Sequence, residues 1–287
     1  MRSWYKYFTD SSNCESTYIP IDRSYNDHKK SMDGFEADNS YSDKKAFFNR
    51  HFHNSYRNRL IYYDNFIRKH VIKEDDILSI GSGRCVNELK LLEDGYTIVC
   101  SDLDQLGAYK MTKQLFPNFQ FKKFDILKNS SQEKYNVILC LSLIYLFNAE
   151  ELNKFFINVR NSLTKEGILI LDSAGSPDNL LSHFIHEELL KYETKTKAFI
   201  KTIRTPRKEI LITKHTGYRR KDREIINSAK LSGFILCDQE NYDFLTELCR
   251  SYLLNRLIES FSSMEKVFCL IGRHIPYIRM FKFKRDG

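Results

Sequence analysis

Short apolar runs that alternate with amphipathic segments constrain the fold of this chain more than any other feature. Residues 137–141 show no polar alternation, which is typical of a parallel strand covered on both faces. The alternation predicts an α/β fold with a doubly wound, mostly parallel sheet and helices on both of its faces. The predicted strands are 76–80, 97–100, 119–124, 137–141 and 168–171, and the predicted helices among them are 86–92, 103–116 and 150–163.

Flanking segments divide the rest of the chain. An irregular arm is expected over 1–45 and a helical cap over 46–72, where aromatic residues recur in steps of three or four. The core over 73–172 is followed by an insertion over 173–219. The region 220–287 is predicted to hold a helix at 221–231, a strand at 234–237, a helical insertion at 244–261 and a final strand at 277–283.

Composition excludes several classes of protein. With 287 residues, of which 42% are hydrophobic and 14% aromatic, the chain is long and apolar enough to bury a core, so wholesale disorder is excluded. Its N-terminus lacks a signal-peptide pattern and its longest apolar stretch is too short to span a bilayer, so we expect a cytoplasmic protein. The seven cysteines form no CxxC pair, and Cys100, Cys140 and Cys237 lie in apolar runs expected to be buried strands. We therefore expect neither a metal site nor a disulfide framework.

A glycine turn and an acidic residue form the clearest ligand-binding pattern. The first strand runs into Gly81-Ser82-Gly83 and then into a predicted helix, an arrangement that lets a ligand approach the backbone closely. Asp102 ends the next strand, 21 residues after Gly81, where a carboxylate accepts both hydroxyls of an adenosine ribose. The alternative interpretations are a tight turn without ligand and a helix N-cap.

The absence of further glycine motifs indicates which adenosine cofactor fits this turn. A dinucleotide fingerprint needs a third glycine where Val86 stands, and no GxxxxGK[ST] phosphate loop is present. S-adenosylmethionine carries no phosphate, so it fits this turn better. Asp125, after the third strand, is placed to contact its adenine, although a turn aspartate is the alternative.

The chain resembles the class I S-adenosylmethionine-dependent methyltransferases over residues 45–172, and more loosely over 218–240. The similar segments are the glycine turn, the acid motif at 98–103, the segments 124–127, 135–147 and 163–171, and the Gly-Phe turn at 233–234. The resemblance implies a seven-stranded sheet, S-adenosylmethionine as cofactor and S-adenosylhomocysteine as product. It also implies cofactor contacts from Gly81, Ser82, Gly83, Asp102, Leu103, Asp125, Ile126 and Leu141, with Arg57 near the methionine carboxylate. The chain departs from the family at Ser79, where an acid is frequent, and at Cys85, where a third glycine is frequent.

The sequence constrains the methyl acceptor less than it constrains the cofactor. We expect the insertion over 173–219 to cover the acceptor. Enzymes of this family that methylate amino groups of nucleic acids carry Asn/Asp-Pro-Pro after the fourth strand, whereas this chain has Leu141-Ser142-Leu143. We therefore favour an oxygen acceptor on a sugar, a glycan or another small molecule, with His215 as general base and Tyr145 at the cofactor edge. An ordinary loop histidine and a packing tyrosine are the alternatives. His183 and His186 form a weaker candidate pair.

Net charge points to the C-terminal region. The formal charge is +8, and residues 201–287 hold 18 basic and 10 acidic side chains. A solvated basic helix face is one interpretation, and contact with an anionic membrane or a lipid-linked glycan is the other. Two further functions stay open: an RNA methyltransferase, although no recognition module for nucleic acid is visible, and a non-catalytic regulator that binds S-adenosylmethionine. The oligomeric state is not predicted.

Overall fold

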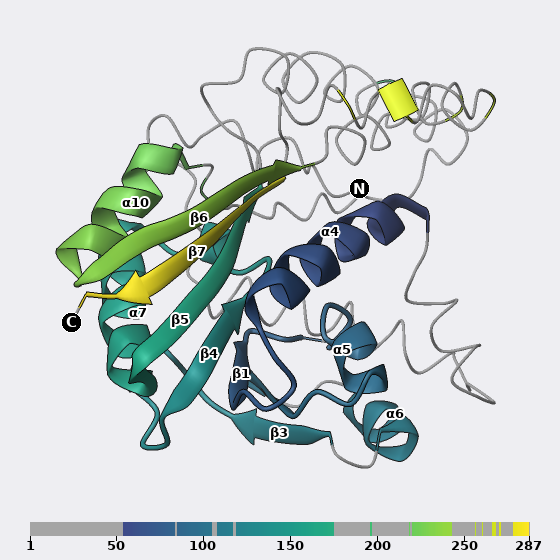
Figure 1. Ribbon diagram of the computed structural model, residues 1–287, viewed down its shortest axis with the longest axis horizontal. Coiled ribbons are helices and arrows are strands. Elements are labelled where there is room, and N and C mark those ends of the chain that lie inside the picture. The colour runs from purple at the N-terminus through teal and green to yellow at the C-terminus, as the bar shows by residue number, and fades with distance from the viewer. Residues whose placement is uncertain are drawn as a thin grey trace, which may run out of the picture.

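The computed structural model describes residues 54–83, 85–104, 108–116, 119–174, 218, 220–242 and 278–286, with single positions at 196, 256, 260, 266, 267 and 270. Within these residues, seven strands form one sheet in the order β3-β2-β1-β4-β5-β7-β6 (Figure 1). The predicted α/β class and the seven-stranded, mostly parallel sheet are confirmed. The arm over 1–45, most of the insertion over 173–219 and the predicted helix over 244–261 lie outside the described residues, apart from single positions.

Parallel pairing and strand order locate a crevice. The parallel strands are β1 (Ile77–Ile80), β2 (Ile98–Asp102), β3 (Gln120–Lys123), β4 (Tyr135–Cys140) and β5 (Leu163–Ala174). The strand β7 (Ile278–Arg285) lies antiparallel between β5 and β6 (Phe234–Tyr242). The order reverses between β1 and β4, and open α/β sheets bind ligands at the carboxyl ends of the strands at such a point.

Helices cover both faces of the sheet, as predicted. Alternate side chains of β1 point to opposite faces, so Ile77 packs in one core cluster and Leu78 in the other. The first cluster lies against α4 (Asn54–His70), α5 (Leu89–Glu93) and α6 (Ala108–Leu115). The second lies against α7 (Ala149–Ser162) and α10 (Asp222–Leu231) (Figure 1). The cap helix α4 thus reaches the sheet edge where the crevice lies.

The helix after the glycine turn begins later than predicted. Cys85 adopts a left-handed backbone conformation with φ 58°, and its N–H donates to the Ser82 carbonyl at 2.8 Å. Residues 85–88 therefore form turns, and α5 starts at Leu89 rather than at Val86. The expectation that a helix N-terminus directly follows the glycines is wrong.

The edge strand β6 is longer than predicted and exposes one cysteine. It extends to Tyr242 instead of ending at Cys237, because its polar residues pair along the whole length of β7. Cys237 is exposed, so the expectation that it is buried is wrong: an edge strand has one unpaired side and its outward residues face water. Cys85, Cys100 and Cys140 are buried free thiols.

Candidate functional site

The glycine turn lies at the carboxyl end of β1, at the point where the strand order reverses. Gly81 and Gly83 both have positive φ, at 67° and 54°. Ser82 anchors the turn to β2, because its N–H donates to the Ser101 carbonyl at 2.9 Å and its Oγ accepts from the Ser101 N–H at 3.2 Å. Ser82 Oγ also donates to the Ser79 carbonyl at 3.0 Å. The turn is therefore held open by hydrogen bonds within the protein itself.

Gly81 is required by space as well as by conformation. A Cβ built at Gly81 would lie 2.7 Å from Leu143 Cδ2, whereas one at Gly95, which has φ 86°, meets no atom within 4 Å. We expect Gly95→Ala to lower the free energy of unfolding by about 1 kcal/mol, the cost of left-handed backbone alone. Gly81→Ala should cost about 2 kcal/mol because Leu143 must also move. Urea denaturation of both variants measures the difference, and a larger loss for Gly95→Ala would contradict this account.

Asp102 lies beside the glycine turn, as its spacing predicts. It is buried, its Oδ2 accepts the Gly83 N–H at 2.8 Å, and its Oδ1 accepts the N–H of half-buried Leu103 at 2.7 Å. Strand β2 pairs with β1 in parallel register, so both motifs meet at one sheet edge. A carboxylate has about four acceptor positions, which makes this group suited to hydroxyls of a ligand in the crevice.

The predicted adenine segment follows β3. The Phe124 N–H donates to the Asp102 carbonyl at 2.9 Å, which places this segment next to the acid motif. Asp125 accepts the Leu127 N–H at 3.0 Å and pairs with Lys128 at 3.3 Å, so it has the geometry of a turn aspartate. Ile126 is buried in the core. The adenine role of this segment stays a prediction.

The segment after β4 closes the crevice on its other side. Leu141 is buried in the core cluster beneath α4. Ser142 has an unusual φ of 59°, and the 3-10 turn η2 (Ile144–Leu146) follows. Tyr145 is half-buried and packs against the same core cluster, and its carbonyl accepts the Tyr218 N–H at 2.6 Å. Packing is therefore one role of Tyr145, and a catalytic role is not tested.

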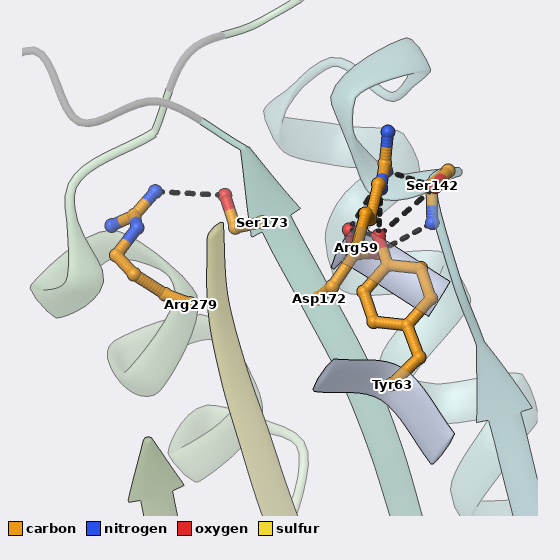
Figure 2. A network of polar contacts seen from close by, with 6 residues as sticks. All are labelled: Arg59, Tyr63, Ser142, Asp172, Ser173 and Arg279. Carbon is orange, nitrogen blue, oxygen red and sulfur yellow. Dashed lines mark hydrogen bonds and ion pairs between the residues drawn. The ribbon is translucent and has the colours of Figure 1, made fainter. Parts of the chain in front are cut away.

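A buried polar network joins α4 to the ends of β4 and β5 (Figure 2). Arg59 donates through Nε to Tyr63 Oη at 2.6 Å, hydrogen bonds Ser142 Oγ, and lies 3.3 Å from Asp172 Oδ2. Tyr63 also donates to Asp172, whose other oxygen accepts the Ser142 N–H at 2.5 Å. Asp172 thus holds the left-handed backbone of Ser142 and the guanidinium of Arg59 at the carboxyl ends of β4 and β5.

Two members of this network, Tyr63 and Arg59, keep their protons in the physiological range. Burial is the largest cause that raises the pKa of Tyr63 well above its ordinary value, and the negative charge of Asp172 adds to it. The Tyr63 hydroxyl therefore stays protonated and donates to Asp172. Arg59 keeps its charge as well, because a guanidinium is not deprotonated in proteins. The network places a cation and two hydroxyl groups at the carboxyl ends of β4 and β5.

This network was not predicted from the sequence. The side chain of Arg57 lies outside the described residues, as do His215, His183 and His186, so these predictions stay untested. Arg59, on the same helix, lies at the carboxyl ends of β4 and β5 through its contacts with Ser142 and Asp172. Its one sequence signal is helical spacing: Arg59 and Tyr63 are four residues apart, so they share a helix face.

A second carboxylate lies behind the glycine turn. Glu88 is buried and accepts from Ser79 Oγ at 2.5 Å, whereas its Oε2 atom has no hydrogen-bond partner in the described part of the chain. Burial raises the pKa of Glu88 to about 7, and the negative charge of Asp102 adds to the increase. Ser79 occupies the position where the resembled family often has an acid, and its hydroxyl donates to this carboxylate, which belongs to a residue nine positions later.

The basic residues of β7 are paired within the protein. On the other side of the β5 end, Arg279 is buried, pairs with Asp222 and donates to Ser173 Oγ at 2.9 Å (Figure 2). Lys284 pairs with Glu166 at 2.6 Å, and Lys282 lies 3.3 Å from His70 Nδ1. Arg279 and Lys284 therefore each have an acidic partner within the protein.

The described residues hold neither a metal-ligand cluster nor a membrane-spanning helix. No group of three or more metal-ligating side chains occurs among the residues that the structure describes. None of the helices in these same ranges has the length and apolar character to cross a membrane. The crevice instead offers left-handed glycines, a buried carboxylate and a cation, which suit the backbone approach, ribose hydroxyls and carboxylate of S-adenosylmethionine.

Comparison with known proteins supports the fold. The chain matches no protein-family model and no curated protein sequence. Among solved structures it is similar to magnesium protoporphyrin IX methyltransferase from Synechocystis PCC 6803 with bound S-adenosylhomocysteine (12% identity, 91% of this chain and 99% of that chain, TM-score 0.53). It is also similar to 1,6-didemethyltoxoflavin-N1-methyltransferase from Burkholderia thailandensis with substrate and S-adenosylhomocysteine (8%, 95% and 92%, 0.56).

A third similar structure is the N-methyltransferase NodS from Bradyrhizobium japonicum WM9 with S-adenosylhomocysteine (10% identity, 92% of this chain and 99% of that chain, TM-score 0.52). Identities this low establish a shared fold. All three proteins are named as methyltransferases and were crystallised with the cofactor product. The fold that the sequence resemblance implies is therefore confirmed.

Proposed function

We propose that this chain, which has the fold of the class I S-adenosylmethionine-dependent methyltransferases, is itself an S-adenosylmethionine-dependent methyltransferase. The observation that carries the proposal is the contact between Asp102 and the Gly83 N–H, which brings the acid and the glycine turn together at the switch point of the sheet. That pairing suits an adenosine ligand whose tail crosses the turn. The solved structures of similar fold bind the same cofactor class.

We propose that each part of S-adenosylmethionine contacts a different group of residues. Gly81 and Gly83 admit the methionine part, Asp102 accepts the ribose hydroxyls, and Asp125 contacts the adenine. For the methionine carboxylate, Arg57 remains a candidate, and we propose Arg59, on the same helix, as a second one. S-adenosylmethionine supplies a methyl group on a sulfonium with a good leaving group, so the protein contributes chiefly by positioning the acceptor in line.

For the acceptor, we propose an oxygen of a sugar, a glycan or another small molecule. The segment after β4 is Leu141-Ser142-Leu143, so it lacks the Asn/Asp-Pro-Pro pattern that orients amino groups of nucleic acids. The paired cations of β7 give no support to an RNA surface. His215 remains the proposed general base. Two of the similar structures are named as N-methyltransferases, so the acceptor atom needs a direct test.

Calorimetric titration tests the cofactor. We expect one molecule of S-adenosylmethionine or of S-adenosylhomocysteine to bind per chain, and the thermal midpoint to rise with ligand concentration. Absence of both heat and midpoint shift with either ligand would contradict the proposal. Transfer of a labelled methyl group to nucleotide sugars and glycans, measured beside RNA, then tests the acceptor class. Label found in RNA alone would overturn the small-molecule proposal and leave the methyltransferase standing.

A further inference from the structure

Glu88 belongs to a cluster of polar and titratable side chains directly behind the glycine turn. Ser79 and Cys100 are register partners on β1 and β2, so their side chains point to the same face of the sheet. Cys85 and Cys100 are both buried, and each thiol shifts the pKa of the other. Glu88 completes the cluster through its 2.5 Å bond from Ser79 Oγ. Glu88 itself is 1% exposed.

This carboxylate lacks the compensation that a buried charge requires. Its Oε2 atom has no hydrogen-bond partner among the residues that the structure describes, although buried polar atoms are nearly always paired. The groups that face it in the described part of the chain are the Ser79 hydroxyl, the thiols of Cys85 and Cys100, and the Asp102 carboxylate. None of these is a cation. A buried carboxylate in such surroundings is either protonated or needs a bound cation to stabilise its ionised form.

The proposed cofactor brings that positive charge to the other side of the turn. S-adenosylmethionine carries a sulfonium and an ammonium against one carboxylate, for a net charge of +1, whereas S-adenosylhomocysteine has no net charge. We infer that Glu88 is the charge partner of the cationic end of S-adenosylmethionine, and that cofactor binding releases the proton of Glu88 to solvent. Glu88 then does the work of the acid that the resembled family often has at the position of Ser79. This inference rests on the proposed function. It makes Glu88 a positioning residue that acts across the glycine turn without touching the ligand.

Calorimetry in buffers with different ionisation enthalpies measures the released proton. At pH 7, where Glu88 is about half protonated, wild type should release about half a proton more than Glu88→Gln on binding S-adenosylmethionine. The excess should nearly vanish at pH 9, and S-adenosylhomocysteine should give less of it. The variant Glu93→Gln, on the exposed side of α5, is the matched control and should behave as wild type. Titration of the cofactor's own amino group is common to all three proteins and cancels in the comparison.

Equal proton release by wild type and Glu88→Gln, with binding intact, would overturn the inference and leave the proposed function standing. Absence of binding by wild type would overturn both. A cofactor-free measurement provides a second test. Because the folded pKa lies above the usual value of 4.5, Glu88 stabilises the protein at low pH and loses that contribution as pH rises through 7. The thermal midpoint of wild type relative to Glu88→Gln should fall by roughly 5 °C from pH 5 to pH 8.5, and parallel curves would contradict the placement of Glu88.

Discussion

Asp102→Ala is expected to weaken S-adenosylmethionine binding by about 100-fold or more. Hydrogen bonds to a charged acceptor contribute about 1.5–3 kcal/mol each, and the carboxylate is proposed to accept two ribose hydroxyls. The same substitution removes the acceptor of the Gly83 N–H, so the turn also loses one of its anchors. Calorimetric titration measures the dissociation constant, and the thermal midpoint of the ligand-free variant shows whether folding is affected.

Asp104→Ala is the matched control for this prediction. Asp104 lies two residues further along, is half-buried and forms a 3.8 Å ion pair with Lys123. It changes the net charge by the same amount but removes no proposed ribose contact, so we expect less than a threefold change in affinity. If both variants lose affinity equally, the effect is long-range charge and the ribose role of Asp102 is wrong.

Local patterns predicted the parts of the structure that depend on neighbours in sequence. The strands β1, β2 and β4 are short apolar runs. The spacing between Gly81 and Asp102 predicted that the two motifs lie side by side, because neighbouring parallel strands end at the same edge of a sheet. The capping box of α7, in which Asn148 and Glu151 each cap the other's backbone, likewise agrees with the predicted helix start at 150 to within a residue. These features carry their signal within a few residues.

Long-range contacts left no such signal. Arg59 and Asp172 are 113 residues apart, and nothing in either local sequence indicates that they meet. Glu88 lies in the turn before α5, and nothing in the local sequence indicates that its carboxylate accepts from Ser79 on β1. Cys85 has the left-handed backbone conformation of a glycine although it carries a Cβ. Residues 85–88 therefore cannot join the helix, and α5 begins only at Leu89. Tertiary packing decided each of these cases.

Asp172→Ala is expected to lower the free energy of unfolding by about 3–5 kcal/mol, because it leaves the buried Arg59 guanidinium without this carboxylate. The side chain of Asp172 is 2% exposed and ties together α4, β4 and β5. Arg59→Met should cost less, since Tyr63 and the Ser142 N–H still satisfy Asp172. The free energy of unfolding of the double variant should fall by at least about 1 kcal/mol less than the sum of the two single losses. Each single change leaves a buried group of the same network without its partner, whereas the double change removes both partners.

Urea denaturation of the four proteins completes this double-mutant cycle. The exposed pair of Glu150 and Lys154, 2.7 Å apart on α7, provides the control cycle and should show a coupling below about 0.5 kcal/mol. Additive losses for Arg59 and Asp172 would mean that their contact contributes nothing beyond its parts. Coupling confined to the buried pair, together with loss of cofactor affinity in Arg59→Met, would show that one network both holds the cap helix on the sheet and supplies the cation of the crevice.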